Sequence, residues 1–227
     1  MFIGHYGAAF GLKSLDHETP LWIYLLGVQL VDIFFFAFVL LGIEKMNIVP
    51  GYTAYNSYDL YCMPYTHSLL GNVLWFAGTS LLGYIVFKKW FPQVHNKVFL
   101  SLLIGFSVFS HFITDLLVHT PDLPLWSADS PKIGLGLWNY VGITIGLELL
   151  LLLAGIYIYY KKSNLSSASL FNKKMAGIAL FMMLITVITP FMPEPYSPQE
   201  LAIQGLISFF LIAGMGYWLE NKKIAST

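Results

Sequence analysis

Six apolar segments alternate with short polar segments along this chain. A helix needs about 20 predominantly apolar residues to cross the hydrocarbon core of a bilayer, and each of the six approaches or exceeds that length. Residues 1–14 are apolar but too short for a crossing, so we expect them to lie at the interface or to enter partway as a re-entrant helix. The predicted spans are 20–43, 65–87, 98–118, 135–160, 175–191 and 201–219. The pattern predicts an all-α, polytopic transmembrane bundle that forms a single domain over residues 1–227.

Composition supports membrane insertion. Hydrophobic residues make up 57% of the chain and charged residues 11%, with a mean hydropathy of +0.68. Soluble domains carry about 25% charged residues, so an ordinary soluble class is excluded. All twelve basic residues are lysine. Without arginine, we expect neither a nucleic-acid groove nor a bidentate arginine clamp on phosphate.

The lysines are distributed unevenly between the connections. Segment 88–97 holds three, segment 161–174 holds four, and two follow residue 219, whereas the alternate connections hold one each or none. Because lysine-rich connections stay on the cytoplasmic side, we expect these segments and both termini to be cytoplasmic.

A polar stripe interrupts the third predicted span. His111, Asp115 and His119 recur every four residues, which places them along one helix face. Ionisable groups at membrane depth are costly and normally face a bundle interior or a water-filled cavity, so the stripe indicates a functional site. The structural alternative is that the histidines are hydrogen-bonding groups between packed helices.

The spacing along the helix predicts one role for His111 and Asp115 and a different role for His119. His111 and Asp115 lie about 6 Å apart along a helix, which lets both bind one ion. His119 lies about 12 Å from His111 along a regular helix, so we expect it to be a ligand of a second metal, a proton shuttle or an outer-sphere group.

Three further residues could complete the site. His67 opens the second span, where it could act as a metal ligand or be merely interfacial. Asp32 and Glu148 are carboxylates within other spans, and either could finish a metal shell or act as a general base. Buried neutral carboxylates held by hydrogen bonds are the alternative. His17 and His95 lie in connections, where we expect solvent exposure.

Four short motifs carry a family resemblance. HYGAAFGLK with His5, LGVQLVD with Asp32, YTHSLLG with His67, and SHFITD with His111 and Asp115 together resemble the YdjM-like family of bacterial membrane-bound, metal-dependent hydrolases. The resemblance covers roughly residues 1–125 and implies an inner-membrane helical bundle in which His5 joins the metal ligands. The chain departs from the family where a PDxD-like pair is replaced by QLVD, and where the HRG before THS is replaced by MPY.

Together these features predict a membrane-embedded hydrolase. We expect a divalent metal, zinc, on His5, His67, His111 and Asp115, with catalytic roles for Asp32, His119 and Glu148. The substrate would be an ester or phosphoester of a lipid or lipid-linked molecule, attacked by metal-activated water. A proton- or cation-conducting transporter subunit and a non-catalytic membrane scaffold are the alternative functions.

Overall fold

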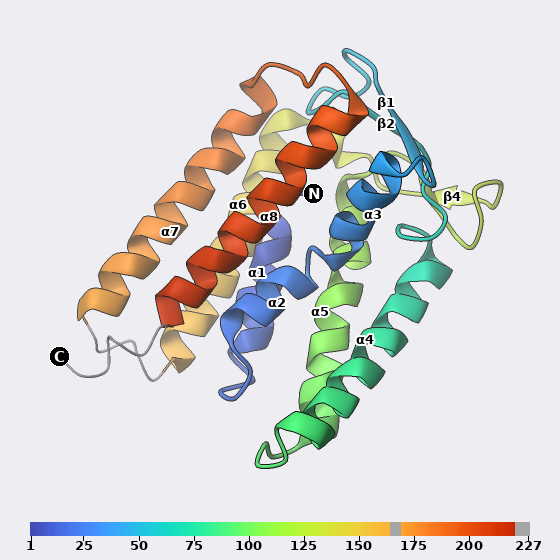
Figure 1. Cartoon of the computed structure of the whole chain (residues 1–227). Coiled ribbons are helices and arrows are strands. Elements are labelled where there is room, and N and C mark those ends of the chain that lie inside the picture. The colour runs from blue at the N-terminus through green and yellow to red at the C-terminus, as the bar shows by residue number, and fades with distance from the viewer. Residues whose placement is uncertain (164–168, 221–227) are drawn as a thin grey trace.

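The computed structural model describes residues 1–163 and 169–220, which fold as a helical bundle (Figure 1). Short strands and 3-10 turns are confined to the connections. The α-helices are α1 (Gly4–Lys13), α2 (Leu21–Gly27), α3 (Leu30–Leu40), α4 (Leu69–Trp90), α5 (Lys97–Val118), α6 (Val141–Lys162), α7 (Ser169–Ile188) and α8 (Pro198–Glu220). The all-α polytopic bundle predicted from the apolar pattern is therefore confirmed.

Five helices, α4 to α8, are long and apolar enough to cross a membrane. The first predicted span, 20–43, is broken into α2 and α3, which meet at an angle of 51° and would make a sixth crossing if they count as one. The segment predicted as the first span therefore consists of two helices with a bend between them. Gln29 lies at the break, and its side-chain amide donates a hydrogen bond to the Phe2 carbonyl at 3.1 Å.

Helix boundaries differ from the expected ones at several connections. Helix α4 begins at Leu69 because Ser68 caps it, with its hydroxyl accepting the Gly71 amide at 2.9 Å. Helix α6 begins at Val141, after the 3-10 turn η1 (Leu137–Asn139), so the start expected at residue 135 is part of a loop. Helix α7 begins before residue 175 and ends in a second 3-10 turn, η2 (Thr189–Phe191). The middle of the expected basic linker, residues 164–168, lies outside the described residues.

Two small antiparallel sheets cover one end of the bundle, here called the loop end. Strand β1 (Lys45–Ile48) pairs with β2 (Tyr58–Cys62), and β3 (Leu123–Pro124) pairs with β4 (Lys132–Ile133). The opposite, lysine-rich end carries the lysines at the end of α4, at the start of α5 and at the end of α6 (Figure 1). The two ends therefore differ in structure and in charge.

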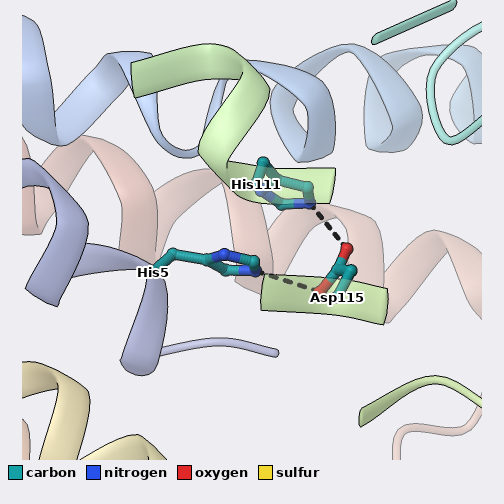
Figure 2. Close-up of side chains that lie close together, drawn as sticks. All are labelled: His5, His111 and Asp115. Carbon is teal, nitrogen blue, oxygen red and sulfur yellow. Dashed lines mark ion pairs between the residues drawn. The ribbon is translucent and has the colours of Figure 1, made fainter. Parts of the chain in front are cut away.

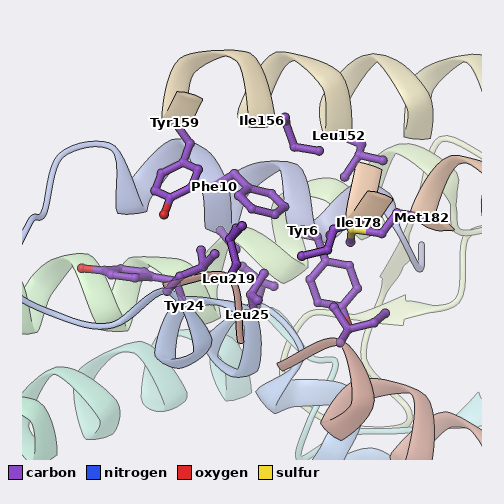
Figure 3. Packing of buried hydrophobic residues seen from close by; sticks show 14 of the residues in the cluster. Tyr6, Phe10, Tyr24, Leu25, Leu152, Ile156, Tyr159, Ile178, Met182 and Leu219 are labelled. Carbon is purple, nitrogen blue, oxygen red and sulfur yellow. The ribbon is translucent and has the colours of Figure 1, made fainter. Parts of the chain in front are cut away.

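Helix α1 lies inside the bundle, against α6, α2 and α5, rather than on the surface of the bundle. It packs closely on α6: a Cβ added at Gly155 would lie 2.0 Å from the Gly7 carbonyl oxygen. Apolar side chains fill the space around α1, including Tyr6, Phe10 and Leu152 (Figure 3). This apolar core fixes the short helix that carries His5.

Helix α5 is the most buried of the five long helices. Its buried side includes His111 and Asp115, which are 0% and 1% exposed. The polar stripe predicted from the sequence therefore faces the interior of the bundle.

Candidate metal centre

Imidazoles and carboxylates from five parts of the chain meet in the interior. Helices α1, α3 and α5 each supply side chains, and the turns before α4 and after α5 supply one histidine each. We call this group the His/Asp cluster. Its members are His5, Asp32, His67, His111, Asp115 and His119.

Asp115 lies at the centre of the cluster. Its Oδ2 atom is 2.9 Å from His111 Nε2, 3.4 Å from His119 Nε2 and 3.7 Å from His67 Nε2. Its Oδ1 atom is 3.2 Å from His5 Nε2 (Figure 2). All four imidazoles therefore direct the same ring atom toward one carboxylate.

Asp32 supplies a second carboxylate beside two of these rings. Its Oδ1 atom lies 3.2 Å from His67 Nε2 and 3.5 Å from His111 Nε2. Zinc–ligand distances of 2.0–2.1 Å in a tetrahedral site place neighbouring ligand atoms about 3.3 Å apart. The separations in the cluster match that spacing.

Outer hydrogen bonds fix the tautomers of His111 and His67. His111 Nδ1 lies 2.7 Å from the Val28 carbonyl oxygen, which can only accept, so Nδ1 carries the proton. His67 Nδ1 lies 2.9 Å from Thr66 Oγ1. The Thr66 hydroxyl donates to Glu44 Oε2 at 2.6 Å, so its oxygen accepts from the imidazole. Both Nε2 atoms thus keep a lone pair for the cluster.

His5 and His119 follow the same rule. His5 Nδ1 lies 2.7 Å from Thr114 Oγ1, whose hydroxyl donates to carbonyls of its own helix, so the threonine oxygen accepts from the ring. His119 Nδ1 donates to Asp122 Oδ1 at 2.8 Å. Histidines that bind metals characteristically donate their other ring N–H to a carbonyl or carboxylate in this way.

Burial of an Nε2 lone pair costs free energy unless a hydrogen-bond donor or an ion binds it. The Nε2 atoms of His5 and His111 are buried and have no hydrogen-bond partner. Neutral imidazole is the form that binds a metal ion.

The cluster is almost closed to its surroundings. Among its ion-paired side chains Asp32 is the most exposed, at 17%, whereas His5 and His111 are at 0%. Asp32 is therefore the member of the cluster that is least shielded from its surroundings. The Met1 α-amino group also reaches the cluster and donates to Asp115 Oδ1 at 2.6 Å.

Glu148 has a different position from the one expected of a catalytic group. Its Oε2 atom accepts the Gly4 amide at 3.0 Å, and its Oε1 atom accepts the Tyr55 hydroxyl at 3.3 Å. It thus anchors the first turn of α1, next to His5. Among the described residues, no hydrogen bond or ion pair joins Glu148 to the cluster.

Sequence reasoning missed the groups that orient the imidazoles. Glu44 lies in the connection between the first two predicted spans, yet it is buried and accepts from the backbone of Tyr65 and Thr66 as well as from the Thr66 hydroxyl. Thr66 directly precedes His67, which was the only signal for its role. His17 and His95 are exposed and lie outside the cluster, as predicted.

Two sets of three residues have the spacing of metal ligands, with all donor atoms within 4.8 Å of one another. They are His5, His111 and Asp115, and Asp32, His67 and His111. A buried cluster of imidazoles and carboxylates could therefore hold a metal ion within this apolar bundle.

Searches of protein-family models, curated proteins and solved structures find no match to this chain.

Proposed function

We propose that this protein is a membrane-embedded, metal-dependent hydrolase that cleaves an ester or phosphoester bond of a lipid or lipid-linked substrate. The single observation that carries the proposal is the common orientation of four imidazoles. Each donates its Nδ1–H outward and directs Nε2 at Asp115. Hydrogen bonding between packed helices does not require one shared target, whereas metal binding does.

Zinc is the proposed ion because imidazole and carboxylate are among its usual ligands. His67, His111, Asp32 and Asp115 would hold it, with His5 as a further ligand. The resemblance to the YdjM-like hydrolases supports the same residues, and we propose membership of that family and a bacterial inner-membrane location. If the lysine-rich end is cytoplasmic, the site faces the outer half of the membrane.

His119 is the proposed acid–base residue. Asp122 holds its Nδ1–H, which leaves Nε2 to exchange protons beside Asp115. His119 would take a proton from the attacking water as the water oxygen bonds to the carbonyl carbon or phosphorus. The ester bond to the leaving oxygen then breaks, and that oxygen receives the proton as the alcohol departs. A bound zinc ion would lower the pKa of the attacking water to about 7.

A lipid substrate suits the position of the site. The spanning helices expose large apolar side chains such as Leu74, Leu150 and Ile207, which are suited to contact with acyl chains. Asp32, at the more open side of the cluster, lies on α3 within the membrane-depth pair α2–α3. A substrate that already lies in the bilayer can reach this depth without leaving hydrocarbon.

The transporter alternative requires ionisable groups along the full depth of the bundle. Here the His/Asp cluster is followed toward the lysine-rich end by apolar packing around Phe10, Tyr24 and Leu25 (Figure 3). That layer opposes a continuous proton or cation path. A scaffold without activity would tolerate replacement of the cluster histidines.

Hydrolysis of lipid esters and lipid phosphoesters by the detergent-purified protein tests the proposal. We expect turnover that a chelator removes and zinc restores, that His111→Ala abolishes, and that His95→Ala leaves unchanged because His95 is exposed outside the cluster. No turnover by the zinc-loaded protein, or equal turnover by His111→Ala, would contradict it. Ion flux into liposomes that Asp32→Asn abolishes would support the transporter instead.

A further inference from the structure

Lysines gather at the lysine-rich end where α6 ends, α7 begins and α8 ends (Figure 1). We call this place the lysine corner, and its lysines are Lys161, Lys162, Lys173 and Lys174. None of them belongs to the His/Asp cluster. We propose that the lysine corner binds the headgroup phosphate of an anionic phospholipid.

Direct contacts hold the three helix ends together. Lys174 Nζ donates to the Trp218 carbonyl oxygen at 2.8 Å, which joins α7 to α8. The Tyr159 hydroxyl donates to Glu220 Oε1 at 2.8 Å, which joins α6 to α8. Helices α6 and α7 also pack against each other. The four lysines are therefore held on neighbouring helix ends, where several ammonium groups can act on one anion.

Nearby acidic side chains do not neutralise the lysine corner. Glu220 is already engaged, because its Oε2 atom accepts the Leu21 amide at 2.6 Å and its Oε1 atom lies 3.7 Å from Lys13 Nζ. Among the described residues, no ion pair joins a carboxylate to any of the four lysines. Lys173 and Lys174 lie near the start of α7, where the helix dipole disfavours a cation unless an anion is present. The corner thus carries positive charge that an anionic ligand would balance.

Two of the ammonium groups lie over aromatic rings on the outer surface of the bundle. Lys161 Nζ is 5.7 Å from the centroid of the Tyr157 ring, and Lys174 Nζ is 4.1 Å from that of Trp218. Tyr157 and Trp218 are 62% and 50% exposed, on helices long and apolar enough to cross a membrane. Tyrosine and tryptophan at the ends of such helices lie at headgroup level. The positive charge therefore borders the acyl chains, which favours a lipid headgroup over a soluble anion.

A polar pocket opens beside the corner, between the ends of α1, α6 and α8. Lys13, Tyr159, Lys162 and Glu220 are among the residues that line it. Lys13 is paired with Glu220, whereas no described carboxylate pairs with Lys162. A lysine ammonium is a common partner of phosphate oxygens, and basic pockets between membrane helices bind lipid headgroups. Lys162 is thus placed to contact a headgroup phosphate whose acyl chains lie along the bundle.

Binding of defined lipids tests this site without using activity. The delipidated full chain in detergent is titrated with phosphatidylglycerol or phosphatidylcholine, and bound lipid is counted by native mass spectrometry. We expect phosphatidylglycerol to bind about tenfold more tightly. Replacing Lys161 and Lys162 together by Gln should weaken its binding about 25-fold, because each lysine near an anionic headgroup contributes about fivefold. The matched control replaces Lys88 and Lys89, the exposed lysines in the last turn of α4, and should bind as the wild type does.

Three outcomes would overturn the proposal. Equal binding of the two lipids would exclude selection by charge, and equal losses in the two double variants would exclude the lysine corner as the site. Complete displacement of phosphatidylglycerol by millimolar inorganic phosphate would assign the corner to free phosphate instead. Circular dichroism checks the folding of each variant. Zinc binding should be the same in all of them, because the corner and the His/Asp cluster share no residue, so either site can fail without the other.

Discussion

The Nδ1–H of His111 donates to the carbonyl of Val28 at 2.7 Å, at the point where the first predicted span breaks. In an uninterrupted helix that carbonyl would accept the amide of Asp32, four residues on. The 51° bend between α2 and α3 makes it available to α5 instead. One irregularity in the backbone thus orients His111 and brings Asp32 beside it, 3.5 Å from His111 Nε2.

Two threonines provide the same kind of support for other imidazoles. Thr66→Val and Thr114→Val each remove the oxygen that accepts a ring N–H, from His67 and His5 respectively. Loss of such outer partners costs about 10–100-fold in metal affinity, and we expect that loss for each variant in a zinc titration. Thr79→Val is the control, because Thr79 Oγ1 bonds only within its own helix. Equal affinity in all three variants would oppose the assigned orientation of the rings.

Asp122 should affect catalysis more than metal binding. Its carboxylate holds His119 Nδ1–H at 2.8 Å, and Thr120 donates to its other oxygen at 2.9 Å. Asp122→Asn weakens the control of the His119 tautomer, so we expect kcat to fall by about 10²–10⁴-fold, the usual contribution of an acid–base residue. Zinc content should remain that of the wild type. A variant with full kcat would exclude His119 from the acid–base role.

Close packing of α1 on α6 should be necessary for the position of His5. A Cβ at Gly155 would lie 2.0 Å from the Gly7 carbonyl oxygen, so Gly155→Ala must displace α1. Such overpacking typically costs about 1–3 kcal/mol, seen as a lower melting temperature in detergent. Gly146→Ala, on the same helix, meets nothing within 4 Å and should melt as the wild type does. Similar melting of both variants would contradict the close approach.

Glu148 should stabilise the start of α1 rather than take part in the reaction. It accepts the Gly4 amide at 3.0 Å and the Tyr55 hydroxyl at 3.3 Å. Glu148→Ala leaves a buried N–H unpaired, which costs about 1–3 kcal/mol of stability, whereas Glu148→Gln keeps one acceptor and should lose less. If Glu148→Gln abolishes turnover at full stability and zinc content, the carboxylate is itself catalytic.

Sequence patterns predicted the bundle and most of the cluster for the same reason. Ionisable side chains are rare within apolar spans, so Asp32, His111 and Asp115 stand out wherever the fold places them. Periodicity could not locate the break at Gln29, because the apolar run continues through it. Nor could it show that Glu44 and Thr66 orient His67, since that relation joins the ends of different elements. His5 reached the cluster only through the burial of α1, which requires the complete bundle.

X-ray absorption at the zinc edge of the loaded protein tests the central claim that the cluster is a metal centre. We predict a first shell of nitrogen and oxygen at about 2.0–2.2 Å with outer-shell scattering from several imidazoles, and loss of that imidazole signal in His111→Ala. A shell of water oxygens without imidazole scattering, or a spectrum unchanged by His111→Ala, would contradict the claim.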